Sequence, residues 1–566
     1  MLLSLSLLSL ASFGIARPAI SFDSPTFDVD LARRDSASQG PTAEIKNGTV
    51  HGITLGSFDQ EAFLGIPYAQ PPTGNLRLRK PRSLEKGFDG GSYTAGEYSP
   101  ICPGFGGDDV GYELSEDCLT VNVVRPAGVA ANASLPVGVW IYGGGYQQGG
   151  SADRRYNGTW VVQRSVEMEK PIIFVSLNYR VSALGFLNSP ALEQEGNQNI
   201  GLYDQRLALH WINENIDAFG GDSSKVTIWG ESAGAFSVAG HILGYGLNST
   251  NLFRGAIMES GAVSLYAVNN ASSTYSPDEK QAETYATIVE KAGCSASDDS
   301  KQLECLRGLS LDKFNSSVAG TNWRPVVDGE LIPMSPNQQM AQGTFVKVPI
   351  LLGTNTDEGS SFGLRHINTT EELIQSQLIN YPGLTRDTAE KLVSLYPDEP
   401  AIGCPYNTGD GVLPTGLQDK RSLSIAGDVV MTAPRRLLAE SAARYSPVYS
   451  YRFDSVPQNA TINIGTAHFQ EVAYVFSNPL PTQNPLGTRP GDAELAQLMT
   501  SQWVSFIHDQ TPNNNKVNGS VPEWPNYQDS PKNFVFRRNG SWVEPDTYRK
   551  EGIAYINEIA SVAYGR

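Results

Sequence analysis

A single short segment joins an apolar run to a serine flanked by glycines: Val226-Thr227-Ile228-Trp229-Gly230-Glu231-Ser232-Ala233-Gly234. The run at 226–229 predicts a buried strand, and the residues after Gly234 are compatible with a helix. A serine at a sharp turn between strand and helix needs small neighbours, because Cβ atoms on either side would crowd the turn. The segment therefore predicts an α/β fold with Ser232 as a nucleophile, in preference to a turn serine that only caps the helix.

The same G-x-S-x-G pattern occurs again at Gly359-Ser360-Ser361-Phe362-Gly363. A chain with 56 glycines is expected to show such a pattern by chance, so the pattern alone decides little. The second copy follows the polar residues 354–358 rather than a strand-like run. We interpret Ser361 as a loop serine.

Further apolar runs bounded by turn residues recur outside this segment. They lie at 135–142, 171–177, 348–353 and 448–453. Continuous apolar runs are typical of parallel strands covered on both faces, and helical periodicity at 203–219 and 494–508 lies between them. Strands alternating with helices predict an α/β fold, in which function collects in loops at the carboxyl ends of the strands.

The amino-acid composition limits the classes of protein to which this chain can belong. The 566 residues include 42 Lys and Arg against 59 Asp and Glu, a net charge of −17, which argues against a nucleic-acid partner. With 40% hydrophobic and 18% charged residues, the chain can bury a large core. The sequence has no CxxC or His-rich spacing, so we expect no metal site. One domain is the simplest organisation, because the sequence shows no internal repeat and no low-complexity linker.

The N-terminal region predicts export. Residues 2–13 are mostly apolar and are followed by the small residues Gly14 and Ala16, so we interpret 1–16 as a signal peptide that is too short to span a bilayer. Residues 17–34 end in Arg33-Arg34 and form a candidate pro-segment, which leaves 35–566 as the catalytic domain. N-linked glycans are expected in a secreted chain. Ten sequons occur, at Asn47, Asn132, Asn157, Asn248, Asn270, Asn315, Asn368, Asn459, Asn518 and Asn539.

A nucleophilic serine needs a neighbouring base, and six histidines are available. In α/β hydrolases the chain order is serine, acid, histidine, which leaves His366, His468 and His508. His508 lies in a predicted helix, and His366 is only eight residues beyond the best acid candidate. His468 ends the glycine-bearing loop Gly465-Thr466-Ala467-His468 after a predicted strand, and it is our candidate base.

The acid candidates follow the strand predicted at 348–353. Asp357 and Glu358 both stand in the loop Thr354-Asn355-Thr356-Asp357-Glu358-Gly359. Either carboxylate could orient a histidine and stabilise its imidazolium form. The spacing does not decide between them.

Acyl transfer also needs backbone N–H donors for the developing oxyanion. The strand at 135–142 ends in Gly143-Gly144-Gly145-Tyr146, where glycines let amides face a ligand, and the N–H of Ala233 completes the set. A phosphate loop is excluded, because Gln148 stands where a glycine is required and no Gly-Lys-Ser/Thr follows. Tyr146, Trp323 and Phe362 are candidates for the substrate pocket and equally for core packing.

Together these motifs resemble the type-B carboxylesterase family, which includes cholinesterases, carboxylesterases and some fungal lipases. The resemblance covers nearly the whole chain from about residue 43. The matching motifs are Phe63-Leu64-Gly65-Ile66-Pro67-Tyr68-Ala69, Ser115-Glu116-Asp117-Cys118-Leu119, Trp140-Ile141-Tyr142-Gly143-Gly144-Gly145, Asn178-Tyr179-Arg180, Phe219-Gly220-Gly221-Asp222, Gly230-Glu231-Ser232-Ala233-Gly234, Asp357-Glu358-Gly359 and Gly465-Thr466-Ala467-His468.

The resemblance implies an α/β-hydrolase fold, with a large, mostly parallel sheet covered by helices on both faces. It implies that Ser232, Glu358 and His468 are catalytic and that Gly144, Gly145 and Ala233 form the oxyanion hole. It also implies a small-molecule ester substrate and no cofactor. Five cysteines in a secreted chain predict two disulfides and one further thiol. The resemblance implies the pairs Cys102–Cys118 and Cys294–Cys305 and leaves Cys404 unassigned.

One departure from the family pattern bears on the substrate. Only fifteen residues, 103–117, separate Cys102 from Cys118, where lipases and cholinesterases of the family carry a long loop. This short loop has no tryptophan to hold a quaternary ammonium group, which argues against a cholinesterase. We expect a secreted carboxylesterase for short- to medium-chain or soluble esters. The alternatives are a lipase or sterol esterase for long-chain esters and a non-catalytic binding protein on the same fold.

Overall fold

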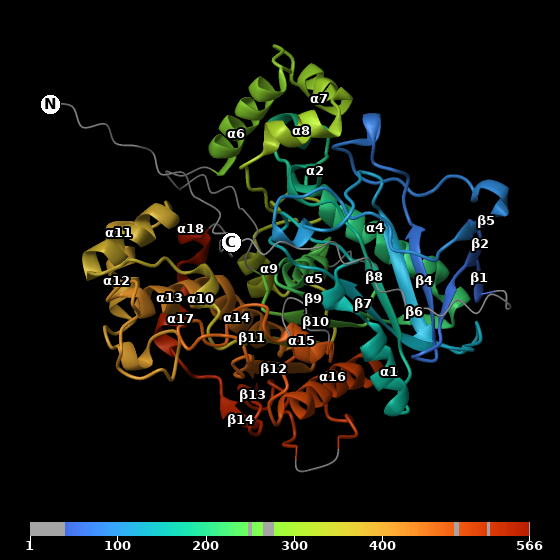
Figure 1. Cartoon of the computed structure of the whole chain (residues 1–566). Helices are drawn as coiled ribbons and strands as arrows, with labels where there is room; N and C mark the ends of the chain where they lie inside the picture. Colours follow the sequence, from blue (N-terminus) through green and yellow to red (C-terminus); the bar gives the residue numbers. More distant parts are fainter. Residues whose placement is uncertain (1–39, 247–251, 264–276, 480–485, 518–520, 565–566) are drawn as a thin grey trace.

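The computed structural model describes residues 40–246, 252–263, 277–479, 486–517 and 521–564 (Figure 1). The predicted signal peptide at 1–16 and the predicted pro-segment at 17–34 lie outside the described residues, as do the sequons at Asn248, Asn270 and Asn518.

A sheet of eleven strands forms the centre of the molecule. Its strands are β3 (Ile53–Leu55), β4 (Gln60–Pro67), β6 (Thr120–Pro126), β7 (Leu135–Ile141), β8 (Ile173–Leu177), β9 (Gly221–Glu231), β10 (Gly255–Glu259), β11 (Ile350–Asn355), β12 (Val448–Phe453), β13 (Lys532–Phe536) and β14 (Trp542–Pro545). The order is β14-β13-β12-β11-β10-β9-β7-β8-β6-β4-β3, parallel from β13 to β8 and antiparallel at both edges. The strands predicted at 135–142, 171–177, 226–229, 348–353 and 448–453 are confirmed as β7, β8, β9, β11 and β12.

A second, three-stranded sheet lies near the N-terminus. It contains β1 (Thr42–Ile45), β2 (Gly48–His51) and β5 (Ser92–Thr94). The helix predicted at 203–219 begins earlier, at Ile200, and its last turn is the 3₁₀ segment η6 (Ile216–Phe219).

The helices of the described residues surround the sheet. They are α1 (Thr159–Glu167), α2 (Ser182–Phe186), α3 (Pro190–Gln194), α4 (Ile200–Asn215), α5 (Ala233–Leu243), α6 (Pro277–Ala292), α7 (Asp299–Gly308), α8 (Leu311–Val318), α9 (Pro336–Gln342), α10 (Gly359–Phe362), α11 (Thr370–Asn380), α12 (Arg386–Ser394), α13 (Asp419–Gly427), α14 (Ala433–Ala442), α15 (Val472–Val475), α16 (Asp492–Asp509), α17 (Lys550–Glu558) and α18 (Ala560–Ala563). Among the described residues, none of the helices has the length and hydrophobicity of a membrane span.

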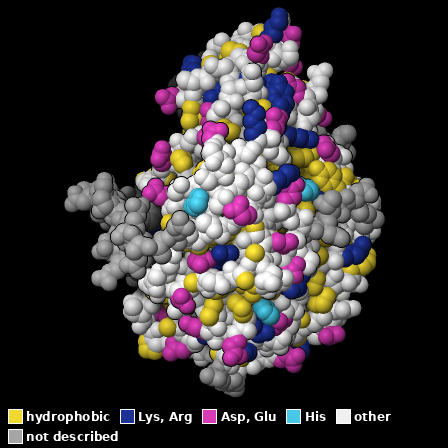
Figure 2. All heavy atoms as spheres, turned by 90° about the vertical axis from the view of Figure 1, so that its right-hand side faces the viewer, with side chains coloured by type: hydrophobic (Ala, Val, Ile, Leu, Met, Phe, Trp, Pro, Cys, Tyr) yellow, Lys and Arg dark blue, Asp and Glu magenta, His cyan; other side chains and the backbone are white. Residues whose placement is uncertain are grey.

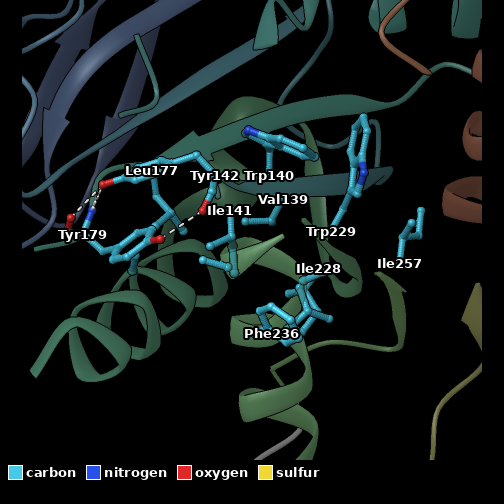
Figure 3. Close-up of a cluster of buried hydrophobic side chains, with 14 of the residues drawn as sticks. Val139, Trp140, Ile141, Tyr142, Leu177, Tyr179, Ile228, Trp229, Phe236 and Ile257 are labelled. Carbon is cyan, nitrogen blue, oxygen red and sulfur yellow. Dashed lines mark hydrogen bonds between the residues drawn. The ribbon is translucent and has the colours of Figure 1, made fainter. Parts of the chain in front are cut away.

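Helices cover both faces of the parallel strands, as expected for buried parallel β-structure. α1 and α16 pack together beneath β6 to β9, whereas α4, α5 and α14 pack against β7 and β9 to β12 (Figure 1). Figure 3 shows Ile228 of β9 beside Phe236 of α5, with Trp140 and Trp229 directed to the other side of the strands. The predicted α/β-hydrolase architecture is therefore confirmed.

Aromatic packing fixes the carboxyl ends of the central strands. Trp140 and Trp229 are fully buried, with ring centroids 4.9 Å apart. Tyr142 and Tyr179 stack at 4.4 Å, and each hydroxyl donates a hydrogen bond to the other's carbonyl oxygen, at 2.7 and 3.0 Å (Figure 3). Buried aromatic pairs of this kind stabilise the fold beyond the area they bury. They hold β7 and β8 where the glycine loop after Tyr142 begins.

Helices α6 to α8 form a projection beyond the sheet layers (Figure 1). The structure contains a disulfide between Cys294 and Cys305 in this projection and another between Cys102 and Cys118. Cys404 is a buried free thiol. Arg77 ties the projection to the rest of the molecule, because its guanidinium binds Glu116 at 2.6 Å and donates to the Leu309 carbonyl at 2.7 Å.

Candidate active site

Ser232 lies at the tight turn between β9 and α5, in the predicted strand–turn–helix context. Its backbone is strained for a non-glycine residue, with φ 55° and ψ −123°, and its N–H donates to the Glu259 carbonyl at 2.9 Å. A Cβ on Gly234 would lie 2.0 Å from the Ile141 carbonyl oxygen, and one on Gly230 would lie 2.5 Å from the Gly234 carbonyl carbon. Both positions require glycine for steric reasons, so the motif holds the serine above the end of the strand.

His468 lies between the serine and an acid. Its Nε2 is 2.8 Å from Ser232 Oγ, and its Nδ1 is 2.8 Å from Glu358 Oε2. The second oxygen of Glu358 accepts the Asn355 N–H at 2.8 Å, which fixes the carboxylate. The ring of Phe362 packs edge-on against the imidazole, with the two ring centroids 4.8 Å apart. The three side chains form a continuous serine–histidine–carboxylate chain.

Asp357, the other acid candidate, contacts different groups. Its carboxylate accepts the Tyr406 N–H at 2.7 Å and the Thr466 N–H at 2.8 Å. Burial raises the pKa of this carboxyl to about 6. Asp357 thus holds the loop that carries His468 but does not contact its imidazole in the way Glu358 does.

The remaining candidates from the sequence lie elsewhere. His366 is exposed in the chain after α10, and His508 on α16 pairs with Asp509 at 2.6 Å. Our interpretation of Ser361 as a loop serine is wrong, because this exposed residue belongs to the short helix α10. The preceding strand β11 extends to Asn355, two residues beyond the predicted apolar run, so the polar residues after it turn directly into α10.

The glycine loop after β7 approaches the serine closely. Gly144 and Gly145 have φ values of +88° and +64°, and a Cβ on Gly143 would lie 3.0 Å from Ser232 Cβ. Ala233 is the first residue of α5, where helix N–H groups lack an intrahelical acceptor. Among the described residues, the N–H groups of Gly144, Gly145 and Ala233 donate to no protein acceptor. These three donors are available to a ligand.

The three aromatic pocket candidates differ in exposure. Tyr146 is fully buried and packs against Phe186 at 4.8 Å. Trp323 is 2% exposed, and its carbonyl oxygen accepts Gln147 Nε2 at 2.6 Å. Phe362 is 37% exposed. Tyr146 and Trp323 are therefore core residues, whereas Phe362 is exposed and contacts His468.

Three buried glutamates behind the histidine were not singled out from the sequence. Glu231 Oε1 is 3.2 Å from His468 Nε2, and Glu471 accepts from Ser260 Oγ at 3.1 Å. Glu259 accepts from the Trp503 indole at 2.7 Å and from the Trp229 indole. Burial raises the pKa of Glu471 to about 7 and raises those of Glu231 and Glu259 well above their ordinary value. Their positions are the signals that the sequence offers: Glu231 and Glu259 end strands β9 and β10, and Glu471 lies three residues after His468.

The arrangement can perform nucleophilic acyl chemistry, since a serine, a histidine and a carboxylate are in hydrogen-bond reach next to free N–H donors. The described residues contain no group of three His, Cys, Asp or Glu side chains that could hold a metal ion.

Known proteins resemble this chain over most of its length. Residues 39–549 match the Carboxylesterase family. The secreted triacylglycerol lipase LIP1 of Gibberella zeae is 34% identical over 555 residues, covering 91% of this chain and 90% of the relative. Lipase 4 of Diutina rugosa is 34% identical over 562 residues, covering 91% of this chain and 96% of the relative. The crystal structure of Aspergillus niger EstA superposes with a TM-score of 0.80 at 30% identity, covering 93% of this chain and 99% of EstA.

The family match, the relatives and the structural neighbour agree with the α/β-hydrolase architecture. The chain belongs to the carboxylesterase family and is an ester hydrolase.

Proposed function

We propose that the protein is a secreted serine carboxylesterase that cleaves esters through a covalent acyl-enzyme. Ser232 Oγ attacks the ester carbonyl while His468 Nε2 takes its proton, and Glu358 holds the imidazole in the useful tautomer. The two 2.8 Å hydrogen bonds of His468 carry this proposal. The protonated histidine then delivers its proton to the leaving alcohol. Water then attacks the acyl carbon while His468 takes its proton, and His468 returns that proton to Ser232 Oγ as the bond between this oxygen and the acyl group breaks and the acid leaves.

The oxyanion of each tetrahedral intermediate is stabilised by the N–H groups of Gly144, Gly145 and Ala233. Support comes from their position beside Ser232 and from the absence of other acceptors for them among the described residues. Preorganised N–H donors stabilise developing charge because they need no reorientation during the reaction. The chemistry requires no cofactor.

Short- to medium-chain or soluble esters are the preferred substrates in this proposal. The loop 103–117 is held by hydrogen bonds to the chain after the glycine loop: Phe105 N–H donates to the Gln147 carbonyl at 2.7 Å, Asp108 N–H to Gln148 Oε1 at 3.1 Å, and Gly149 N–H to Asp109 Oδ1 at 2.9 Å. A lid that opens at an oil surface would have to break these bonds. The short, fixed loop therefore favours dissolved substrates.

A lipase or sterol esterase for long-chain esters is the second candidate. The same loop exposes three apolar side chains, with Val110 at 76%. The others are Phe105 and Leu114. The relatives from Gibberella zeae and Diutina rugosa are named lipases. This candidate predicts a long-chain optimum and a rate increase above the solubility limit of the substrate.

Initial rates on p-nitrophenyl esters from acetate to palmitate separate the two candidates. We expect an optimum at short or medium chains, a smooth dependence on substrate concentration, and loss of turnover in Ser232→Ala. An optimum at palmitate with activation by emulsion would overturn the preference for soluble esters. Retained turnover in Ser232→Ala would overturn the mechanism.

We also propose that the protein acts outside the cell. Two disulfides and a relative named as secreted support an extracellular location. The proposed catalytic domain begins near residue 35 and carries N-linked glycans. Among the described sequons, Asn132, Asn368, Asn459 and Asn539 are exposed and are the first to test for glycosylation.

Figure 2 shows acidic and basic side chains interspersed over one face. With the net charge of −17, this supports a small-molecule ester as partner rather than a nucleic acid.

A further inference from the structure

Arg155 lies between the short disulfide loop and the residue that follows the candidate base. It belongs to the 3₁₀ turn η5 (Arg154–Tyr156), a few residues after the glycine loop, and its side chain is 14% exposed. None of the sequence motifs of the proposed mechanism contains it.

On one side, the guanidinium binds two carboxylates. Nη2 is 2.7 Å from Asp108 Oδ1, and Nε donates to Asp153 Oδ2 at 2.8 Å. Asp108 lies in the loop 103–117, in the 3₁₀ turn η4 (Gly107–Asp109), and its own N–H is bound by Gln148. Arg155 therefore fastens the disulfide loop to the chain that follows the glycine loop. Charge-assisted bonds of a guanidinium to carboxylates are strong and directional.

On the other side, the guanidinium covers an aromatic ring. Its central carbon is 4.6 Å from the ring centroid of Phe469, within the range of a cation–π contact. Phe469 is the next residue after His468 and has φ 74°, a conformation that is unfavourable for a bulky side chain. Such a backbone persists only where its surroundings hold it. The contact with Arg155 is one such restraint, and it acts directly beside the histidine.

We propose that Arg155 is a positioning residue, which couples the disulfide loop to the backbone after His468 and so holds the imidazole between Ser232 and Glu358. If the Phe469 backbone relaxed, the Cα of His468 would turn and both 2.8 Å hydrogen bonds would lengthen. The inference rests on the proposed function, because it assigns Arg155 an effect on the step that His468 performs. It also gives the short disulfide loop a role in catalysis.

Steady-state kinetics on p-nitrophenyl butyrate test the coupling with Arg155→Met and Phe469→Leu. Each variant is expected to lower kcat by about tenfold with KM changed less than about twofold, because displacement of a catalytic group slows chemistry more than binding. The double variant is expected to be no slower than about twice the slower single variant, because both substitutions break the same contact. Arg155→Lys, which keeps a cation over the ring, is expected to recover part of kcat.

Arg164→Met is the matched control. Arg164 on α1 is also 14% exposed and also forms an ion pair, with Glu167 at 3.0 Å, but it contacts neither Asp108 nor Phe469. The control should keep the wild-type kcat. Should Arg155→Met fail to fold, Asp108→Asn and Phe469→Leu replace the pair, because both leave the Arg155–Asp153 contact in place.

Two results would overturn the coupling: a wild-type kcat in folded Arg155→Met or Phe469→Leu, or effects that multiply in the double variant. The Ser232→Ala variant in the same assay separates this failure from failure of the proposed function. If Ser232→Ala is inactive and the Arg155 variants are fully active, only the coupling is wrong. If Ser232→Ala is active, the mechanism itself is wrong.

Discussion

Asp357 and Glu358 are consecutive residues that bind two different parts of the same loop. Glu358 Oε2 lies 2.8 Å from the imidazole of His468, whereas Asp357 accepts the backbone N–H of Thr466 at 2.8 Å. One carboxylate therefore orients the imidazole, and the other fixes the backbone that carries it.

The two carboxylates should respond differently to amide substitution. Glu358→Gln is expected to lower kcat by about 10³- to 10⁴-fold, because an amide cannot stabilise the imidazolium or select its tautomer. Asp357→Asn is expected to cost mainly stability, since its effect on the histidine is indirect. Rates of the two variants at equal folded concentration test this assignment, and a larger loss of kcat in Asp357→Asn would reverse it.

Asp109 predicts a pH dependence of stability. Its Oδ1 accepts the Gly149 N–H at 2.9 Å, but its buried Oδ2 has no hydrogen-bond partner within the described residues. Burial raises the pKa of this carboxyl from 3.8 to about 6, so the folded state binds the proton more tightly than the unfolded state. Between about pH 4 and pH 6 its contribution to the free energy of unfolding falls as pH rises, by about 1 to 2 kcal/mol.

The substitution Asp109→Asn removes this ionisation and leaves an oxygen for the Gly149 N–H. Melting temperatures of both proteins from pH 4 to pH 8 provide the test. Relative to wild type, the variant should gain stability as the pH rises from about 4 to about 6, and the difference should then level off. A difference between the two proteins that stays constant with pH would contradict the raised pKa.

The glycine loop should tolerate alanine at position 145 better than at position 144. A Cβ on Gly144 would lie 2.3 Å from the Gln148 carbonyl oxygen, whereas a Cβ on Gly145 would meet nothing within 4 Å. Gly144→Ala is expected to lower kcat by about 10²-fold, because the loop must move and its N–H donors move with it. Gly145→Ala should cost clearly less. Equal losses would contradict this steric distinction between the two positions.

The two disulfides should differ in their effect on activity. Replacing either pair by serine is expected to lower the free energy of unfolding by about 3 kcal/mol, the usual value for short closed loops. Loss of Cys102–Cys118 should also lower kcat, because loop 103–117 is bonded to the chain after the glycine loop. Loss of Cys294–Cys305 in the α6–α8 projection should leave kcat unchanged in the folded protein. Melting curves and initial rates of the two double variants test this prediction. A folded but inactive Cys294→Ser/Cys305→Ser variant would refute it.

Long apolar runs in the sequence predict the buried parallel strands of the fold. β7, β8, β9, β11 and β12 were predicted because their covered parallel strands read as continuous apolar segments. β10 has only five residues and ends in a buried glutamate, so its apolar run is shorter than those that were recognised. The edge strands β3 and β14 lack a run of this kind, because they are partly solvent-exposed.

The candidate site was predictable where chemistry restricts the choice to few residues. Ser232 needs glycine neighbours in a strand–turn–helix context, and few histidines follow it, so elimination led to His468. The choice between Asp357 and Glu358 depends on which carboxylate reaches the imidazole, which spacing does not reveal. Arg155 carries no motif, because its contacts with Asp108 and Phe469 join segments that are far apart in the chain.

Active-site labelling tests the central claim most directly. After reaction with a fluorophosphonate, the protein should carry one phosphonyl group per chain, and peptide mass mapping should place it on Ser232. Wild type and Ser361→Ala should be labelled and lose activity together, while Ser232→Ala should be neither labelled nor active. A label on another residue, or ester hydrolysis by folded Ser232→Ala, would contradict the account.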